Sequence, residues 1–236
     1  MEKEKIIFLP GLNKQLKFLL SNVDIRNKSV LIAGGNTEHI AKRIFKKTNE
    51  VFIIVDDEED LLNMRYNLSG ENIPVRLMEF SNTDFINKKF DIIYAQGSIT
   101  RTDRNKIIKE FKKLLNEDGI LCCGEIVSLT NDTPPFVKDL WNQSGLSPLN
   151  INSIEDYYKG RGFSIIESLD LSSSLKEFYT LSEEILKENL TILSKEELKQ
   201  FKKFFTGMEH EIKVYLKLGG NKHIGFKTLL LKNQSK

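Results

Sequence analysis

Apolar and polar residues follow two alternating patterns from residue 29 to residue 125. Short runs that are apolar throughout, such as Val51-Phe-Ile-Ile-Val55, are separated by stretches in which apolar residues recur every three or four positions. The first pattern is typical of strands buried on both faces of a parallel sheet, and the second is typical of amphipathic helices. The predicted strands are Ser29–Ala33, Val51–Val55, Val75–Glu79, Phe90–Ala95 and Gly119–Glu125, and the predicted helices are Glu38–Lys47, Glu59–Leu68 and Arg104–Leu115. Together they predict an α/β fold with a doubly wound sheet.

After Glu125 the pattern changes to mostly helical segments. A long helical stretch is predicted from Leu175 to Leu218, with a break near Thr206-Gly207. Its length exceeds what joining two strands requires, so we expect it to form a cap. The other elements predicted here are helices at Phe136–Asn142 and Ser153–Lys159 and strands at Phe163–Leu171 and His223–Lys232. The expected organisation is one domain with four parts: an N-terminal helical segment (1–28), a core (29–171), a cap (172–222) and a last strand with its tail (223–236).

A glycine turn separates the first predicted strand from the first helix of the core. Gly34-Gly35-Asn36 lets backbone N–H groups approach a ligand, because glycine lacks a Cβ and asparagine tolerates a positive φ. The next strand ends on Asp56-Asp57, about 20 residues further on, where a carboxylate can accept both hydroxyls of a ribose. The two features together predict a nucleotide-containing ligand at the carboxyl edge of the sheet.

The order of these elements and motifs resembles a class I S-adenosylmethionine-dependent methyltransferase. Val30–Glu38 is similar to that family's glycine loop, and Asp56 to its ribose-binding acid. Phe90–Gly97 resembles the motif of the fourth strand, and Lys113–Leu121 resembles the segment that leads into the fifth. The resemblance implies a Rossmann-like, seven-stranded, mostly parallel sheet with a helical cap insertion before the last strand. It also implies S-adenosylmethionine as the cofactor.

The same resemblance implies a set of cofactor-binding residues at the strand ends. Glu79 is the best match to the residue that holds the adenine amino group, with Ser81 and Asp84 as alternatives. Asp57 alternatively caps the following helix. The full expected set is Gly34, Gly35, Asn36, Glu38, Asp56, Asp57, Glu79, Phe80, Gln96, Gly97 and Ser98.

Three positions depart from the family's glycine motif. Asn36 stands in place of a glycine, which is a mild change because asparagine can adopt the left-handed conformation. Ile32 stands where the family has an acid, so one polar contact to the methionine end of the cofactor is missing. Glu38 replaces a glycine; there it is favourable to the helix dipole but repels a ligand carboxylate or captures a ligand amino group.

The acceptor is expected to be a small molecule. Tyr215–Phe226 resembles the closing motif of glycine, sarcosine and related small-molecule methyltransferases. We expect Tyr179, His210 and Tyr215 of the cap to bind the acceptor, and the segment at Pro10-Gly11 to lie across the mouth of the cleft. Alternatively, the cap helices cover a sheet face or form a homodimer contact. No obligatory catalytic base is identified.

The composition and charge of the chain limit the kinds of partner that we expect it to bind. The chain has 35 basic and 33 acidic residues, without the basic stripe that nucleic acid binding requires, and no apolar run reaches the length of a membrane span. Adjacent cysteines at Cys122-Cys123 point to opposite faces of a strand and are expected to be apolar core residues. The three histidines match no zinc pattern, so no metal is expected. A reducing cytoplasm fits this cysteine usage.

The sequence therefore predicts methyl transfer from S-adenosylmethionine to a small molecule by in-line displacement. Two alternatives stay open. An NAD-dependent oxidoreductase would share the glycine turn and Asp56, although Leu114–Gly119 argues against it. A non-catalytic relative that binds a cofactor or metabolite would explain Ile32 and Glu38.

Overall fold

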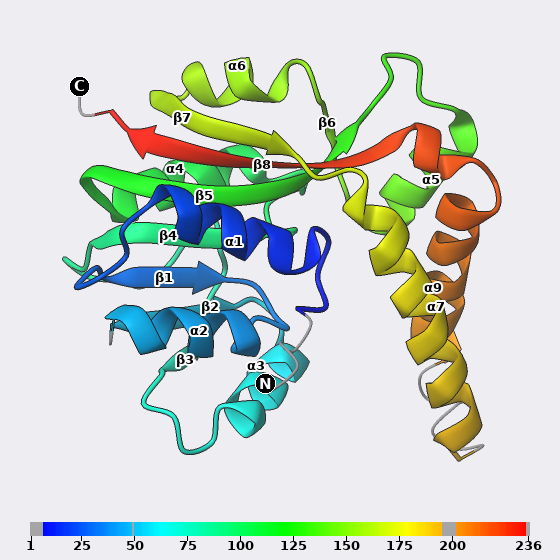
Figure 1. Cartoon of the computed structure of the whole chain (residues 1–236), viewed down its shortest axis with the longest axis horizontal. Coiled ribbons are helices and arrows are strands. Elements are labelled where there is room, and N and C mark those ends of the chain that lie inside the picture. Colours follow the sequence, from blue (N-terminus) through cyan, green and yellow to red (C-terminus); the bar gives the residue numbers. More distant parts are fainter. Residues whose placement is uncertain (1–6, 49, 195–201, 235–236) are drawn as a thin grey trace.

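A computed structural model describes residues 7–48, 50–194 and 202–234 of the chain (Figure 1). The helices are α1 (Leu12–Asn22), α2 (Glu38–Thr48), α3 (Glu58–Asn67), α4 (Arg104–Leu114), α5 (Pro135–Gln143), α6 (Ile154–Lys159), α7 (Ser174–Ile192), α9 (Lys202–Leu216) and the 3₁₀ turn η1 (Gly220–Lys222). The strands are β1 (Val30–Ala33), β2 (Val51–Val55), β3 (Val75–Leu77), β4 (Phe90–Gln96), β5 (Leu115–Ser128), β6 (Leu149–Asn150), β7 (Phe163–Asp170) and β8 (Ile224–Asn233). The expected Rossmann-like α/β fold is confirmed.

One sheet organises the molecule. Its strand order is β3-β2-β1-β4-β5-β8-β7, with the two-residue β6 paired to β5. The first five strands of this path are parallel, and β8 runs antiparallel to both β5 and β7. The chain winds outward in opposite directions from β1 and β4, so the order reverses between these two neighbours. Ligands of open α/β sheets bind at the carboxyl ends of the strands at such a point.

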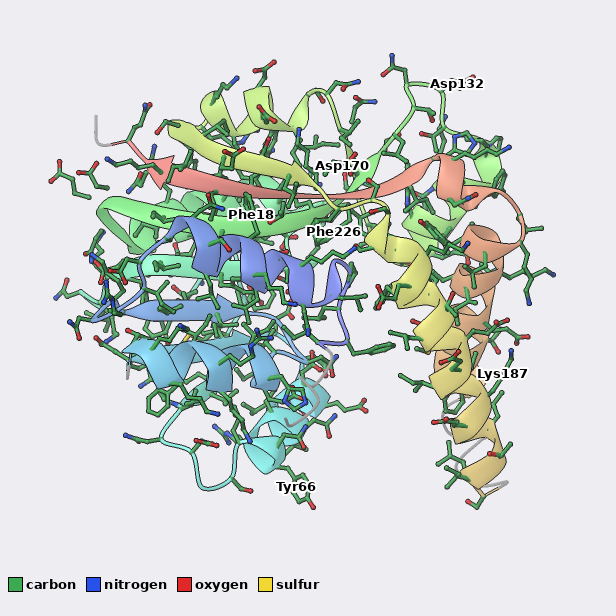
Figure 2. All side chains as sticks on the ribbon, in the orientation of Figure 1. Phe18, Tyr66, Asp132, Asp170, Lys187 and Phe226 are labelled. Atoms are coloured by element: carbon green, nitrogen blue, oxygen red, sulfur yellow. The ribbon has the colours of Figure 1, made fainter. Side chains whose placement is uncertain are left out.

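Alternate residues of the strands supply two separate cores. Leu31 and Ala33 of β1 belong to the cluster under α4 and α6, whereas Val30 and Ile32 belong to the cluster under α1, α2 and α3. This division follows from the two-residue period of a strand. Ile32 is fully buried, so the residue that departs from the family's acid packs in an apolar core. Figure 2 shows the same contrast between core and surface, with Phe226 enclosed on β8 and Tyr66 projecting into solvent.

The predicted helical stretch forms a hairpin of α7 and α9. The two helices pack side by side at the end of the sheet toward which β1 points (Figure 1). The break predicted near Thr206-Gly207 is wrong, because both residues lie within α9 and α7 already ends at Ile192. A single glycine costs a helix only about 1 kcal/mol, which packing along a partner helix readily offsets. No helix in the described ranges is long and apolar enough to span a bilayer.

One strand begins earlier than predicted. β5 starts at Leu115, which pairs with Phe90, and the register then shifts so that Ile92 pairs with Ile120. Asp118 adopts a positive φ of 60° at this irregularity. The irregularity therefore lies inside β5 and not before it.

Candidate functional site

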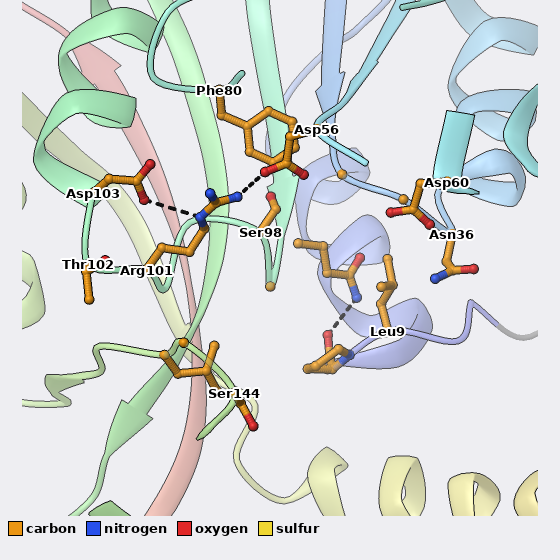
Figure 3. Close-up of a pocket in the computed structure, with 17 residues that line it drawn as sticks. Leu9, Asn36, Asp56, Asp60, Phe80, Ser98, Arg101, Thr102, Asp103 and Ser144 are labelled. Carbon is orange, nitrogen blue, oxygen red and sulfur yellow. Dashed lines mark hydrogen bonds and ion pairs between the residues drawn. The ribbon is translucent and has the colours of Figure 1, made fainter. Parts of the chain in front are cut away.

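A cavity of about 800 Å³ lies where β1, β2 and β4 end (Figure 3). Small-molecule and cofactor sites usually measure ~300–1,000 Å³, so this volume suits a nucleotide-sized ligand together with a small acceptor. The residues that line it are Leu9, Pro10, Gly34, Gly35, Asn36, Asp56, Asp60, Phe80, Gln96, Gly97, Ser98, Arg101, Thr102, Asp103, Ser144, Gly145 and Leu146.

The glycine turn forms one wall of this cavity. Gly34 has a φ of 129° and Asn36 a φ of 55°, so both adopt conformations that most side chains disfavour. The Gly34 amide donates a hydrogen bond to the Ile54 carbonyl (3.0 Å) and thereby ties the turn to β2. A Cβ on Gly35 would lie only 2.1 Å from an Asp60 carboxylate oxygen, so a side chain at this position would displace that carboxylate. The turn therefore presents backbone rather than side chains to a ligand.

Asp56 follows β2 and is held by a cation from across the cavity. Its carboxylate accepts a hydrogen bond from the Arg101 guanidinium, whose Nε also lies 3.2 Å from Asp103 Oδ1. The same guanidinium carbon lies 5.8 Å from the centroid of the Phe80 ring. Burial lowers the pKa of Arg101, but its bonds to Asp56 and Asp103 raise that pKa overall. Arg101 thus brings together the end of β2 and the loop after β4.

Three of the expected cofactor residues lie outside the cavity lining. Asp57 caps α3 by accepting hydrogen bonds from the amides of Glu59 (2.8 Å) and Asp60 (3.1 Å). Glu38 lies in the first turn of α2, and its buried Oε2 has no hydrogen-bond partner in the described part of the chain. Glu79 is exposed in the loop after β3.

Gln96 fastens the N-terminal segment over the cavity. Its Nε2 donates to the carbonyls of Pro10 (2.7 Å) and Leu12 (3.0 Å), and its Oε1 accepts the Tyr94 hydroxyl (2.5 Å). These bonds place Leu9 and Pro10 in the cavity wall, as was expected of the Pro10-Gly11 segment. The neighbouring Ser98 hydroxyl donates to the Ala33 carbonyl (2.8 Å) and so joins the ends of β4 and β1.

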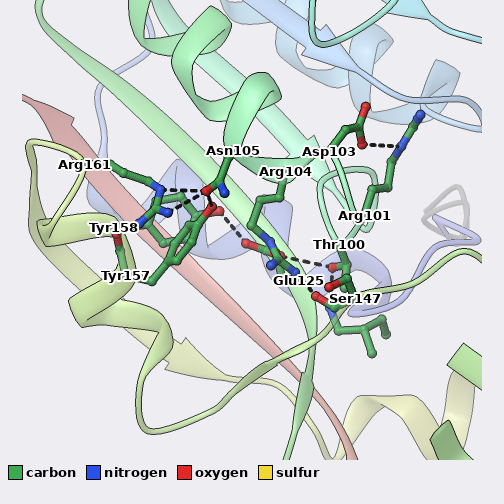
Figure 4. A network of polar contacts seen from close by, with 11 residues as sticks. Thr100, Arg101, Asp103, Arg104, Asn105, Glu125, Ser147, Tyr157, Tyr158 and Arg161 are labelled. Carbon is green, nitrogen blue, oxygen red and sulfur yellow. Dashed lines mark hydrogen bonds and ion pairs between the residues drawn. The ribbon is translucent and has the colours of Figure 1, made fainter. Parts of the chain in front are cut away.

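A buried polar network supports the wall opposite the glycine turn (Figure 4). Glu125 of β5 is fully buried and accepts hydrogen bonds from Arg104 Nε (2.8 Å), Thr100 Oγ1 (3.3 Å) and the Tyr158 hydroxyl. Arg104 also donates to the Ser147 carbonyl, next to the lining residues Ser144, Gly145 and Leu146. Burial, together with Cys123 and Glu125, raises the pKa of Tyr158 well above its ordinary value. The network therefore holds two loops of this wall in fixed positions.

The expected acceptor-binding residues belong to the helical hairpin and do not line the cavity. Tyr179 and Tyr215 are buried, with ring centroids 4.3 Å apart, and the Tyr179 hydroxyl donates to Glu211 (2.7 Å). His210 is exposed on α9. The hairpin meets the N-terminal segment through Phe178, whose ring centroid lies 5.3 Å from that of Phe8.

Several lining residues were not anticipated from the sequence. Arg101, Thr102 and Asp103 follow β4, and Asp60 lies in the first turn of α3. The one available signal was the run of five acidic residues from Asp56 to Asp60, which exceeds what a helix N-terminus requires. Ser144–Leu146 lies between Glu125 and Tyr158 and carries no motif in the sequence.

The cysteines and histidines form no metal centre in the described residues. No three His, Cys, Asp or Glu side chains there are grouped so as to hold a metal ion. Cys122 and Cys123 are free and fully buried, and burial raises the pKa of the Cys122 thiol to about 12. They are core residues of β5.

Comparison with known proteins gives a domain match over part of the chain and a fold. Residues 31–123 match a family described as a methyltransferase domain. No curated protein sequence matches the chain. Among solved structures, a protein from Galdieria sulphuraria assigned as a sarcosine dimethylglycine methyltransferase has a TM-score of 0.74 at 14% identity, over 93% of this chain and 84% of that one.

Two further structures show how widely this fold is used. The [4+2]-cyclase SpnF has a TM-score of 0.77 at 14% identity, over 95% of this chain and 81% of that one. Phosphoethanolamine N-methyltransferase 2 of Haemonchus contortus, in complex with phosphomonomethylethanolamine and S-adenosylhomocysteine, has a TM-score of 0.76 at 14% identity. That match covers 94% of this chain but 53% of the relative. Residues 31–123 thus match a methyltransferase domain, and the chain as a whole has the fold of solved methyltransferases, one of them in complex with S-adenosylhomocysteine.

Proposed function

We propose that the protein transfers a methyl group from S-adenosylmethionine to a small-molecule acceptor by in-line displacement within the cavity. The observation that carries this proposal is the convergence of the glycine turn, Asp56 and Gln96-Gly97-Ser98 on a single cavity at the switch point of the sheet. The structural neighbours named for sarcosine, dimethylglycine and phosphoethanolamine act on small molecules, which supports this acceptor class.

The cavity suits the cofactor in both shape and polarity. The Gly34-Gly35-Asn36 turn brings its backbone to the cavity wall, and Asp56 offers a carboxylate for ribose hydroxyls. When bound, S-adenosylmethionine supplies a methyl group on a positively charged sulfur. The protein's own part is to align the acceptor with that methyl and to exclude water, because the reaction needs orientation more than it needs covalent help.

We place the acceptor against the wall opposite the glycine turn. Arg101, Thr102, Asp103 and Ser144 supply polar groups there, and the Glu125 network fixes the loops that carry them. The helical hairpin, with Tyr179, His210 and Tyr215, is proposed to close over this side. The Phe8–Phe178 contact supports that role because it joins α7 to the segment that Gln96 holds at the cavity.

Thermal denaturation with three ligands tests the proposal. S-adenosylmethionine and S-adenosylhomocysteine should both raise the melting temperature, by the equivalent of about 2.7 kcal/mol at a hundredfold excess over the dissociation constant. NAD should leave it unchanged. Failure of both sulfur ligands at millimolar concentration would refute the proposal, and a shift with NAD alone would favour an oxidoreductase.

Catalysis is tested separately from binding. The protein should release S-adenosylhomocysteine when it is incubated with S-adenosylmethionine and one member of a panel of small amines, thiols and hydroxy compounds. Tight cofactor binding without turnover across such a panel would instead favour the non-catalytic relative.

A further inference from the structure

The charges that line the cavity are unbalanced. Three carboxylates, those of Asp56, Asp60 and Asp103, face it, and Arg101 is the one cation among the described lining residues. The wall therefore carries two more negative charges than positive ones.

Arg101 forms ion pairs with only two of these three carboxylates. Its guanidinium pairs with Asp56 and Asp103 on the far side of the cavity. Figure 3 shows these two pairs on one side, with Asp60 standing apart beside the glycine turn. One of the two excess negative charges is therefore shared by Asp56 and Asp103 around Arg101, and the other belongs to Asp60, which has no cation beside it in the lining that the structure describes.

The Asp60 carboxylate lies against the glycine turn without a polar partner. Its oxygen occupies the space that a Cβ on Gly35 would need, 2.1 Å from that position. Within the described residues this carboxylate accepts no hydrogen bond and joins no ion pair, although its backbone amide donates to Asp57. Asp57 belongs to the same helix terminus but differs in its contacts, because it caps α3 and does not line the cavity.

The charges that act most strongly on Asp60 are of its own sign. Burial and then the carboxylates of Asp57, Asp56, Glu59 and Glu38 raise the pKa of Asp60. Desolvation and like charges both disfavour an ionised carboxyl group, so Asp60 is held where its charge is unfavourable in the free protein. Unfavourable charges of this kind gather at functional sites, because a ligand of opposite charge relieves them.

We propose that Asp60 makes the site discriminate by charge, binding the cationic methyl donor more tightly than the neutral product. This inference rests on the proposed function. In methyl transfer the carbon–sulfur bond breaks, its electron pair stays on sulfur, and an electron pair of the acceptor forms the new bond to carbon. The sulfur ligand thereby loses its positive charge, and with it the attraction of an unpaired carboxylate. Asp60 would then favour exchange of product for fresh donor.

Calorimetry measures this preference directly, without turnover. The dissociation constants of S-adenosylmethionine and S-adenosylhomocysteine are determined for the wild type and for Asp60→Asn, which removes the charge but keeps the shape. We expect the wild type to favour the cationic ligand and Asp60→Asn to reduce that preference about fivefold, as expected for one unit charge acting through a largely hydrated gap.

Asp57→Asn is the matched control. It removes the same charge from the same helix terminus, and asparagine keeps the N-cap. Its effect on the ratio of the two affinities should be clearly smaller, because Asp57 does not line the cavity. A ratio that Asp60→Asn leaves unchanged, or that Asp57→Asn lowers as much, would overturn the assignment. If Asp60→Asn weakens both ligands equally, Asp60 contacts a part that they share, and charge discrimination is again refuted.

A salt titration of the wild type gives a second test that needs no variant. The affinity for S-adenosylmethionine should fall more steeply with ionic strength than that for S-adenosylhomocysteine, because the screening length shrinks from about 30 Å at 0.01 M to about 3 Å at 1 M. Parallel salt dependences would contradict the proposal. Failure of the wild type to bind either ligand is a different result, since it would refute the proposed function itself.

Discussion

The carboxyl edge of the sheet and the α7–α9 hairpin differ in how they are held. At the edge, side chains cross between elements: Ser98 bonds to β1, Gln96 to the N-terminal segment, and Arg104 to β5. The hairpin instead packs mainly through its own apolar and aromatic residues, with β8 and α5 at its base. The edge is thus fixed by polar contacts between distant segments, whereas the hairpin is held mainly by apolar packing. A cofactor site needs the first kind of support, and a lid needs the second.

Removal of Glu125 should have the largest effect on stability, because this residue holds together the contacts of the carboxyl edge. Glu125→Ala leaves Arg104 buried without its partner, and such losses typically destabilise a protein by about 3–5 kcal/mol. Chemical denaturation followed by circular dichroism measures the change in the free energy of unfolding. The control is Glu211→Ala in the hairpin, which should cost far less because Glu211 is bonded to a neutral tyrosine hydroxyl. Equal losses at the two positions would show that the edge is no better fixed than the hairpin.

Substitutions at the end of β2 compare two neighbouring carboxylates of the carboxyl edge, one expected to bind the ligand and one that caps a helix. Asp56→Ala should weaken S-adenosylhomocysteine binding by about 1.5–3 kcal/mol, because it removes charge-assisted hydrogen bonds to the ligand. Asp57→Ala should barely affect binding but should lower stability by about 1 kcal/mol through loss of the α3 cap. Calorimetry and thermal melting separate the two effects. The reverse pattern would mean that Asp57, not Asp56, is the ribose ligand.

A conservative change in the hairpin tests whether it acts on the acceptor alone. Tyr179→Phe removes the hydrogen bond to Glu211 at a cost of about 1 kcal/mol of stability. The affinity for S-adenosylhomocysteine should not change, because Tyr179 does not line the cavity. A rise in the acceptor KM at constant cofactor affinity would support the lid. Loss of cofactor affinity would instead show that the hairpin belongs to the cofactor site.

The contribution of the hairpin to stability should also depend on pH. Burial raises the pKa of Glu211, against the lowering effects of Tyr179 and His210. A raised native pKa means that the native state binds the proton more tightly than the unfolded state. Stability should therefore fall as pH rises from the ordinary value of 4.5 through the raised one. In Glu211→Gln, melting curves recorded across that range should show a weaker dependence of stability on pH. An unchanged dependence would show that other carboxyl groups cause it.

Local patterns predicted the parts of the fold that depend on neighbours in sequence. The apolar run Val51–Val55 has the same bounds in the structure as in the prediction, and the conformations of Gly34 and Asn36 follow from their residue types. Arg101 and Asp60 could not be found in this way. Arg101 matters because its loop faces the end of β2, and Asp60 because glycine at position 35 leaves room for its carboxylate. Both depend on contacts between segments, which periodicity does not reveal. The break predicted near Thr206-Gly207 was wrong for a similar reason, since Phe205 and Met208 on either side pack against the apolar cluster of the hairpin.

The position of the two cysteines offers a built-in reporter of how the molecule opens. Cys122 and Cys123 are the only thiols of the chain, and they lie on β5 between β4 and β8 with no exposed surface. Because the thiolate is the reactive form and burial raises the pKa of Cys122 to about 12, alkylating reagents should modify it only in molecules whose central strands have separated. The rate of alkylation under native conditions would then count rare openings of the sheet, and a cofactor that binds the closed form should slow it. A cysteine introduced on the surface of α7 or α9 could meanwhile be labelled alone, so that a fluorophore there follows the hairpin while the native thiols stay silent.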